Sequence, residues 1–201
     1  QDLTRKVAEM GGLAEREVSD AVAALTRRDR DLAQRVVASD PTIDGLQREI
    51  EEKAILTIAR RQPMAVDLRE VVCALRVSND LERIGDLAKN ISKRVMALDG
   101  EFHPQKLIRG VEHMGSLVCD QLRQVLDAFA GRNLGVALAV WKGDEEIDSM
   151  CTSLFRELLT YMMEDPRNIT FCIHLMFCAK NIERMGDHAT NIAESVYYMI
   201  E

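Results

Sequence analysis

The sequence predicts an all-α protein made of two tandem pseudo-repeated antiparallel three-helix bundles, six helices in total. Only 4 prolines and 11 glycines interrupt the 201 residues, which leaves room for long helices. Aromatic residues make up 4% of the chain and methionines number 10, a composition that favours helices packed through aliphatic side chains over a β-sandwich. The segment NDLERIGDLAKNI at 79–91 recurs as KNIERMGDHATNI at 180–192. This recurrence indicates that one structural unit is present twice.

The repeat extends well beyond this motif. The segment MGGL at 10–13 corresponds to MGSL at 114–117. Further matching pairs are Ala24 and Ala128, Val36 and Val140, Asp40 and Asp144, Ile43 and Ile147, and Asp44 and Asp148. A period of about 100 residues indicates duplicated domains and not a solenoid of short repeats. We therefore expect one repeat at residues 1–101 and the second at residues 102–201.

Apolar periodicity and helix-breaking residues predict where each helix begins and ends. We expect helices near residues 3–28, 30–60, 65–98, 105–130, 134–164 and 168–200. The segment 27–30 marks the first turn, and Pro63 marks the second because proline removes a backbone donor and disfavours helix before it. Residues 100–104 join the halves, and 131–133 and 164–166 repeat the first two turns. Such short connections make each trio of helices antiparallel.

Two places in the chain carry further expectations. Asp40 and Pro41 fall inside the second helix. We expect a kink there, or the end of one helical piece with Asp40 capping the next. Trp141, the one tryptophan of the chain, is expected in the core.

Composition disfavours several functional classes. The net charge of −7 disfavours a nucleic-acid partner and direct adhesion to anionic lipid. No run approaches 18 apolar residues, so we expect no transmembrane span, and we identify no signal peptide. The five cysteines form no CxxC pair, a pattern typical of reduced thiols in the cytoplasm. We therefore expect a cytoplasmic protein.

The recurring motif carries an acidic stripe. The apolar seam of its helix passes through Ile84. Because successive residues of a helix are about 100° apart, Glu82 and Asp86 fall roughly opposite that seam. The second copy repeats the arrangement with Glu183 and Asp187. We therefore expect both stripes to lie on the outer surface and not in a core.

The residues alone leave two interpretations of the stripe open. Carboxylates four residues apart repel by a few tenths of a kcal/mol, and Arg83 and Lys89 could relieve this on an ordinary charged face. A solvated face, however, has no physical need for the same Glu, Gly, Asp and Asn in both halves. The repetition favours a binding site, and paired carboxylates suit an oxygen-preferring cation such as Mg²⁺, Mn²⁺, Ca²⁺ or iron.

Hairpin geometry supplies a third carboxylate to each stripe. If the second and third helices fold back at 62–63, Asp44 lies beside Glu82. The corresponding turn of the second half places Asp148 beside Glu183. Asp44 and Asp148 are themselves repeat partners, although each could instead be a solvated Asp in the first turn of a helix.

Four other residues near the stripes have competing explanations. Asp40 and Asp144 could also contribute, but a capping role already accounts for Asp40. Gly85 and Gly186 sit in mid-helix, where glycine costs about 1 kcal/mol relative to alanine. They leave room either for an ion cluster or for close helix packing.

The chain lacks the motifs of several enzyme classes. None of its four histidines completes an ExxH on a helix, which argues against a ferritin-like di-metal oxidase. It has no glycine-rich phosphate loop and no GxSxG. A metal-dependent phosphohydrolase that uses the clusters as two-metal sites is the main alternative function, although we identify no general base for it. A structural helical scaffold without ions is a second alternative.

Seven segments carry a family resemblance. They are MGGLAEREVSDAV at 10–22, DLAQRVVASD at 31–40, RRQPMAVDLR at 60–69, LERIGDLAKNI at 81–91, LDAFA at 126–130, YMMEDPRNI at 161–169 and CAKNIERMGDHATNI at 178–192. Together they closely resemble the PhoU family, which implies two three-helix bundles and metal clusters. The metal ligands that the resemblance implies are Glu82, Asp86 and Asp44 in the first half, and Glu183, Asp187 and Asp148 in the second. The metal could be Mg, Mn, Fe or Zn, since family members differ in the metal that they bind.

The function that the resemblance implies is regulatory and not enzymatic. PhoU-like proteins are cytoplasmic adaptors of phosphate homeostasis that couple the phosphate-specific ABC transporter to a sensor histidine kinase. When phosphate is plentiful they restrain uptake and repress the phosphate-starvation regulon. The implied partners are the ATPase subunit of the transporter, the kinase and a second copy of the chain in a homodimer. The membrane would be reached only through these partners.

Overall fold

The chain is helical throughout the part that the structure describes. The computed structural model describes residues 2–98 and 104–201. Its elements are α1 (Asp2–Arg27), α2 (Arg30–Arg61), α3 (Ala65–Ala97), α4 (Gln105–Gly131), α5 (Leu134–Lys142), α6 (Asp144–Glu164), the 3-10 turn η1 (Pro166–Asn168) and α7 (Ile169–Ile200). No strand occurs within these two ranges, so the all-α prediction is confirmed. The expected boundary between residues 101 and 102 lies outside the described residues.

Capping side chains set corresponding helix starts in the two halves. Asp29 caps α2 and Asn133 caps α5, each by accepting a hydrogen bond from the backbone N–H three residues on, at 2.9 and 3.2 Å. The residues before them, Arg28 and Arg132, both have left-handed backbone conformations, with φ of 52° and 51°. The duplication in the sequence therefore extends to the conformation of the turns.

A single helix over 134–164 and a helix end at Asp40 are both wrong, while the alternative of a kink at Pro41 stays a prediction. The helix expected over 134–164 is interrupted at Gly143, since glycine has a low helix propensity and the acidic residues that follow suit the start of a new helix. Pro41, in contrast, lies inside an uninterrupted α2, so Asp40 caps no helix. Asp40 is 7% exposed and binds the Lys89 ammonium at 2.7 Å. This tertiary contact and the buried residues around it offset the backbone hydrogen bond that the proline removes.

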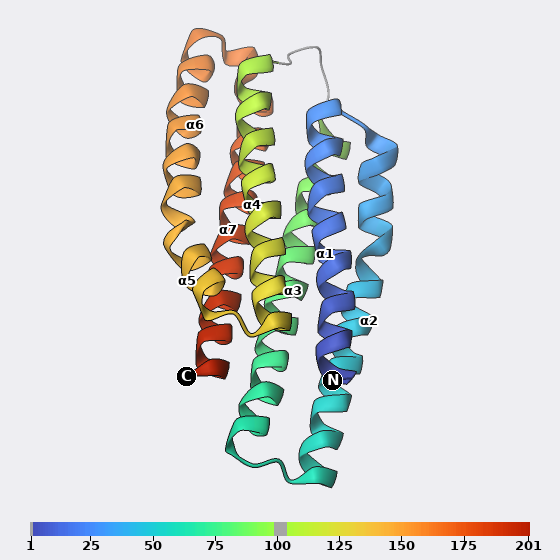
Figure 1. Cartoon of the computed structure of the whole chain (residues 1–201). Coiled ribbons are helices and arrows are strands. Elements are labelled where there is room, and N and C mark those ends of the chain that lie inside the picture. The colour runs from blue at the N-terminus through green and yellow to red at the C-terminus, as the bar shows by residue number, and fades with distance from the viewer. Residues whose placement is uncertain (1, 99–103) are drawn as a thin grey trace.

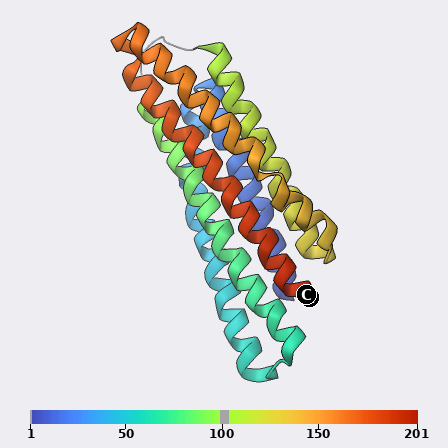
Figure 2. The same ribbon diagram turned by 90° about the vertical axis from the view of Figure 1, so that its left-hand side faces the viewer.

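The two halves pack against each other through antiparallel helix pairs. α3 packs on α7 in the centre of the molecule, and α1 packs on α4 (Figure 1 and Figure 2). Cys73 donates to the Ser195 carbonyl at 3.2 Å, and Arg94 contacts His174 at 3.4 Å. Residue numbers rise along α3 as they fall along α7, so this pair is antiparallel. The α2–α3 and α6–α7 turns accordingly lie at opposite ends of the elongated molecule (Figure 1).

Two glycines let α1 and α4 approach closely. A Cβ at Gly11 would lie 2.7 Å from the Leu126 side chain, and a Cβ at Gly115 would lie 2.7 Å from the Val22 side chain. Gly11 and Gly115 are repeat partners, as are Val22 and Leu126. The same contact is therefore made twice, which relates the two halves by an approximate twofold axis.

The apolar core runs through both halves. Ile84 of the predicted seam on α3 is fully buried, and so is its counterpart Met185 on α7. Trp141, in contrast, is 43% exposed and packs edge to face against Tyr197. Its expected core position is wrong because α5 covers α7 from outside and buries only two of its own residues.

Two expectations about the whole chain can be compared with the structure. All five cysteines lie within the described residues and none forms a disulfide. None of the described helices is both long enough and apolar enough to cross a membrane. Both findings agree with the expectations from composition.

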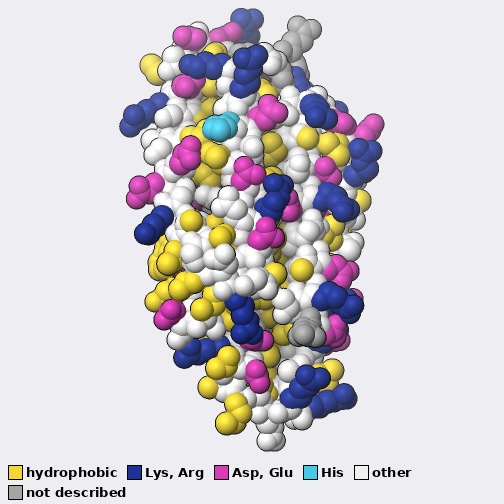
Figure 3. All heavy atoms as spheres, in the orientation of Figure 1, with side chains coloured by type: hydrophobic (Ala, Val, Ile, Leu, Met, Phe, Trp, Pro, Cys, Tyr) yellow, Lys and Arg dark blue, Asp and Glu magenta, His cyan; other side chains and the backbone are white. Residues whose placement is uncertain are grey.

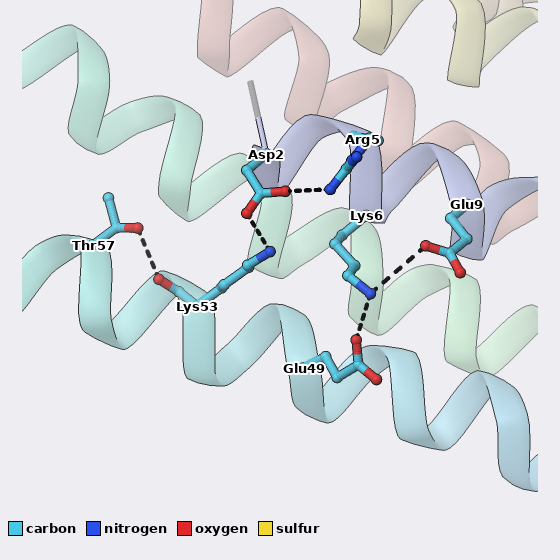
Figure 4. A network of polar contacts seen from close by, with 7 residues as sticks. All are labelled: Asp2, Arg5, Lys6, Glu9, Glu49, Lys53 and Thr57. Carbon is cyan, nitrogen blue, oxygen red and sulfur yellow. Dashed lines mark hydrogen bonds and ion pairs between the residues drawn. The ribbon is translucent and has the colours of Figure 1, made fainter.

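Surface ion pairs join the start of α1 to α2 (Figure 4). Lys6 binds Glu49 at 2.5 Å. Asp2 binds Arg5 at 2.9 Å and also Lys53. Exposed pairs of this kind contribute about 0–1 kcal/mol each, so the buried apolar contacts set the packing of these helices.

Gly115→Ala should destabilise the protein more than Gly11→Ala. The new methyl group at position 115 meets the branched Val22 side chain, whose rotamer is restricted, whereas Leu126 opposite Gly11 can rotate. We expect Gly115→Ala to lower the free energy of unfolding by about 1–3 kcal/mol, as measured by urea denaturation.

Gly12→Ala is the matched control. A Cβ at Gly12 meets nothing within 4 Å, so the higher helix propensity of alanine should raise the free energy of unfolding by up to about 1 kcal/mol. If alanine at positions 12 and 115 changed stability equally, the close approach of α1 and α4 would be wrong.

Candidate functional site: two acidic clusters

Carboxyl groups of the second half converge between two helices. One side-chain oxygen from each of Asp144, Asp148 and Asp187 lies within 4.8 Å of the others. The first two residues lie near the start of α6 and the third on α7. Glu183, one turn before Asp187, lies close enough to Asp148 for its charge to raise the pKa of Asp148. We call these four residues the second cluster; Asp144, a weaker candidate from the sequence, belongs to it.

Burial and mutual repulsion disfavour the ionised form of the second cluster. Burial raises the pKa of Asp144 to about 6, and the charges of Asp148 and Asp187 add to the rise. Burial is also the main cause of the raised pKa of Asp148 and of Asp187, followed by the charge of Glu183 in each case. A bound cation would lower these pKa values, because it stabilises the carboxylate form.

The first half gathers the corresponding residues around a lysine. Burial, followed by the charge of Asp86, raises the pKa of Glu82. The charge of Asp44 adds to this rise, which places it near Glu82. The Lys89 ammonium binds Asp40 at 2.7 Å and Asp86 at 3.0 Å. We call Asp40, Asp44, Glu82 and Asp86 the first cluster.

Each cluster also receives a residue that the sequence motifs did not identify. Glu17 of α1 is 2% exposed; one carboxyl oxygen accepts a hydrogen bond from the Ser39 hydroxyl at 2.6 Å, and the other has no hydrogen-bond partner among the described residues. Burial raises the pKa of Glu17 to about 7, and the charges of Asp40 and Asp44 add to the rise. Its repeat partner, Gln121 of α4, likewise has a buried oxygen without a partner in the described chain.

The sequence did contain a signal for Glu17. It lies on the buried face of α1, between Ala14 and Ala21. Gln121 occupies the corresponding position of the second copy. A polar side chain among small apolar residues in both copies indicates that it is held inside the bundle for a reason other than packing.

Gly85 and Gly186 make room for these side chains. A Cβ at Gly85 would lie 2.9 Å from a side chain of α2 and 3.4 Å from the unpartnered oxygen of Glu17. A Cβ at Gly186 would lie 3.3 Å from an Asp144 oxygen and 3.7 Å from the Gln121 oxygen. Close helix packing, one of the two explanations left open by the sequence, is therefore confirmed, and both glycines lie next to polar oxygens at the clusters. Room for an ion cluster stays a prediction.

The acidic stripes are only partly exposed. The side chains of Glu82 and Glu183 are 18% and 16% exposed, so the expected outer-surface position is wrong for these two glutamates. Asp187 and its neighbour Asp148 are exposed, as expected. The glutamates are covered because α3 packs against α1, α2 and α7, and α7 packs against α3, α4, α5 and α6.

The residues of the second cluster fit an oxygen-preferring cation. Its donors are carboxyl oxygens, with an amide oxygen of Gln121 nearby, which is the ligand type that Mg²⁺, Mn²⁺, Ca²⁺ and iron accept. Asp144 and Gln121 each have a buried oxygen that no described donor satisfies, and a cation would satisfy it. His188, although next to Asp187 in the chain, turns instead to Asp80 of α3 at 2.8 Å.

The fold and the clusters define a class of protein: an all-α chain of two repeated units, each with an acidic cluster between two of its helices. The chain matches the PhoU domain twice, at residues 7–95 and 111–196. It therefore belongs to the PhoU family.

Similar proteins match almost the whole chain. A phosphate-specific transport system accessory protein PhoU homolog of Rhizobium meliloti (strain 1021) is 60% identical over 98% of this chain and 83% of its own length. A protein of the same name from Caulobacter vibrioides (strain NA1000 / CB15N) is 55% identical over 98% of this chain and 85% of its own length. The crystal structure of PhoU from Pseudomonas aeruginosa superposes with a TM-score of 0.94 at 40% identity, over 99% of this chain and 95% of that one.

Glu17→Gln should stabilise the metal-free protein at alkaline pH. The folded-state pKa of Glu17, about 7, lies above its ordinary value of 4.5, so folding favours the protonated acid. That stabilisation is complete below about pH 4.5 and is lost as the pH rises through about 7. Glutamine removes the ionisation. With a chelator present, the variant should exceed the wild type in free energy of unfolding by about 1–3 kcal/mol at pH 8 and by much less at pH 5, as measured by urea denaturation.

Gln121→Glu is the reciprocal control, because it places an ionisable group at the corresponding position of the second half. It should lower the free energy of unfolding more at pH 8 than at pH 5. If the effect of Glu17→Gln is the same at both pH values, Glu17 does not ionise with the raised pKa described above.

Proposed function

We propose that the protein is a regulatory adaptor of phosphate uptake. It restrains a phosphate-specific ABC transporter through the ATPase subunit, and it acts with a sensor histidine kinase to repress phosphate-starvation genes when phosphate is plentiful. The observation that carries this proposal is the PhoU domain match to both halves, together with 60% identity to a relative named as a phosphate transport accessory protein. The relatives are named as accessory or regulatory proteins, which supports a role without catalysis.

The surface supports recognition of partner proteins. Large apolar side chains are exposed at both hairpin turns, among them Ile55, Met64 and Val66 near the α2–α3 turn and Met163 near the α6–α7 turn. Figure 3 shows acidic and basic side chains intermixed over one face, with hydrophobic side chains gathered toward its lower left. Exposed apolar side chains on helices suit the docking of partner helices, and the net charge of −7 disfavours nucleic acid.

The acidic clusters are ion sites in this proposal. The residues that would hold ions are Asp144, Asp148, Glu183 and Asp187 in the second half, and Asp44, Glu82 and Asp86 in the first. A divalent or iron-type cation neutralises the crowded carboxylates and links neighbouring helices. The ions thereby stiffen the helices that a partner would contact, and they need no catalytic role.

We place the protein in the cytoplasm as a homodimer that reaches the membrane only through its partners. The absence of any disulfide among five cysteines, all of them in the described residues, supports a reducing compartment. The kinase and the ATPase subunit would both present cytoplasmic domains to it.

Deleting the gene should raise alkaline phosphatase expression in phosphate-rich medium, because the adaptor that keeps the phosphate-starvation genes off is missing. The wild-type gene supplied on a plasmid should restore low expression. Tagged wild-type protein should recover the ATPase subunit and the kinase in a pull-down experiment.

Low alkaline phosphatase after deletion, together with a pull-down that recovers neither partner, would refute the adaptor function. Turnover of phosphoesters with added Mn²⁺ that is lost in Asp86→Ala and Asp187→Ala would instead establish the metal-dependent phosphohydrolase, the alternative function.

A further inference from the structure

The two clusters differ at one pair of corresponding positions. Lys89 of α3 corresponds to Thr190 of α7. The Lys89 ammonium lies between Asp40 of α2 and Asp86 of its own helix, at 2.7 and 3.0 Å. The Thr190 hydroxyl donates instead to the Gly186 carbonyl of its own helix at 3.1 Å. The first cluster thus contains a positive charge that the second cluster lacks at this position.

We propose that Lys89 is the built-in cation of the first cluster, and that only the second cluster takes up a divalent metal ion when metal is limiting. This inference rests on the metal binding proposed above and adds an order: the second cluster binds metal first, and the first cluster binds it only when metal is in large excess. The ligand is a hard divalent cation, for which Mn²⁺ is the probe.

The carboxyl groups of the two clusters are spaced differently. In the second cluster, one oxygen from each of Asp144, Asp148 and Asp187 lies close enough to the others to share one ion, and this is the one such trio within residues 2–98 and 104–201. The counterparts in the first cluster form no such trio. Asp40 and Asp86 both turn to the Lys89 ammonium instead, so these carboxylates already have a cation between them.

Cationic side chains near the second cluster leave the converging trio accessible. Lys180 pairs with Glu183 at 2.6 Å on the same helix and is 51% exposed, so it is free to move into solvent. His188 turns toward α3. Asp144 keeps a buried oxygen that no described donor satisfies, as Glu17 does beside the first cluster. A cation would satisfy either acceptor, so the difference between the clusters lies in the converging trio and in Lys89.

Metal binding at the first cluster has to displace the Lys89 ammonium. Asp40 is buried, so losing its charge-assisted hydrogen bond is costly at low local dielectric. A metal ion and an ammonium group at the same place also repel each other. Lys89 therefore keeps the first cluster free of metal until metal is in large excess.

Exchanging the two residues tests the proposal. Chelated protein is dialysed against limiting Mn²⁺, and the bound metal is measured by elemental analysis. In the wild type, Asp148→Asn should abolish tight Mn²⁺ binding, because only the second cluster is filled. Lys89→Thr should about double the Mn²⁺ bound per chain. Thr190→Lys should weaken Mn²⁺ binding at least about tenfold, equivalent to about 1.4 kcal/mol.

Two variants serve as matched controls. Lys93→Thr removes an exposed lysine from the same helix and should leave Mn²⁺ uptake at the wild-type level. Lys89→Arg keeps the positive charge and should gain no Mn²⁺. Circular dichroism establishes that each variant is folded; if Lys89→Thr unfolds, Thr190→Lys and Asp148→Asn still decide the outcome.

Three results would overturn the inference. If the Asp148→Asn variant loses only half of the bound Mn²⁺, the wild-type protein fills both clusters. If the folded Lys89→Thr variant binds no more Mn²⁺ than the wild type, the lysine does not control metal occupancy. The same conclusion follows if the Thr190→Lys variant binds Mn²⁺ as well as the wild type does. None of these results would alter the deletion phenotype expected of the adaptor, so the two proposals fail independently.

Discussion

Crowding of carboxylates between packed helices is the constraint on which both halves of this molecule depend. Four acidic side chains meet in each half, and partial burial lowers the local dielectric, so their repulsion is stronger than on an open helix face. In the first half the Lys89 ammonium offsets it by binding Asp40 and Asp86. In the second half Lys180 pairs with Glu183 at 2.6 Å, but the three converging aspartates have no ammonium between them, and burial raises the pKa of Asp144 to about 6. Protons or a bound cation would reduce the repulsion among them.

The approximate twofold relation between the halves builds these clusters in pairs. Close contacts at Gly11 and Gly115 join α1 to α4, and antiparallel packing joins α3 to α7. In each half the first helix, α1 or α4, supplies a buried polar group. α2 or α6 supplies two aspartates, and α3 or α7 supplies a glutamate and an aspartate. α2 and α6 lie on opposite sides of the molecule (Figure 1). The carboxylates of both sites therefore correspond, while the cationic residues around them, such as Lys89 in the first half and Lys180 in the second, do not.

Most of the architecture could be predicted because helix periodicity, turn residues and the internal repeat are visible in the sequence without knowledge of tertiary contacts. Hairpin geometry also predicted that Asp148 lies near Glu183. The rest depends on neighbours that are distant in sequence. Glu17 reaches its cluster from another helix, and the glutamates are half-buried because α3 and α7 are surrounded by other helices. Whether Asp40 caps a helix or binds Lys89 depends on a contact between residues 49 positions apart, which no local pattern contains.

In our proposal, Lys89 neutralises the first cluster and a metal ion neutralises the second when metal is limiting. Crystals of the wild-type protein equilibrated with limiting Mn²⁺ would distinguish the two clusters through the anomalous difference map at the manganese absorption edge. We expect an anomalous peak among Asp144, Asp148 and Asp187, and no peak between Asp40 and Asp86, where the Lys89 ammonium remains. Peaks of equal height at both clusters, or a peak at the first cluster alone, would contradict it.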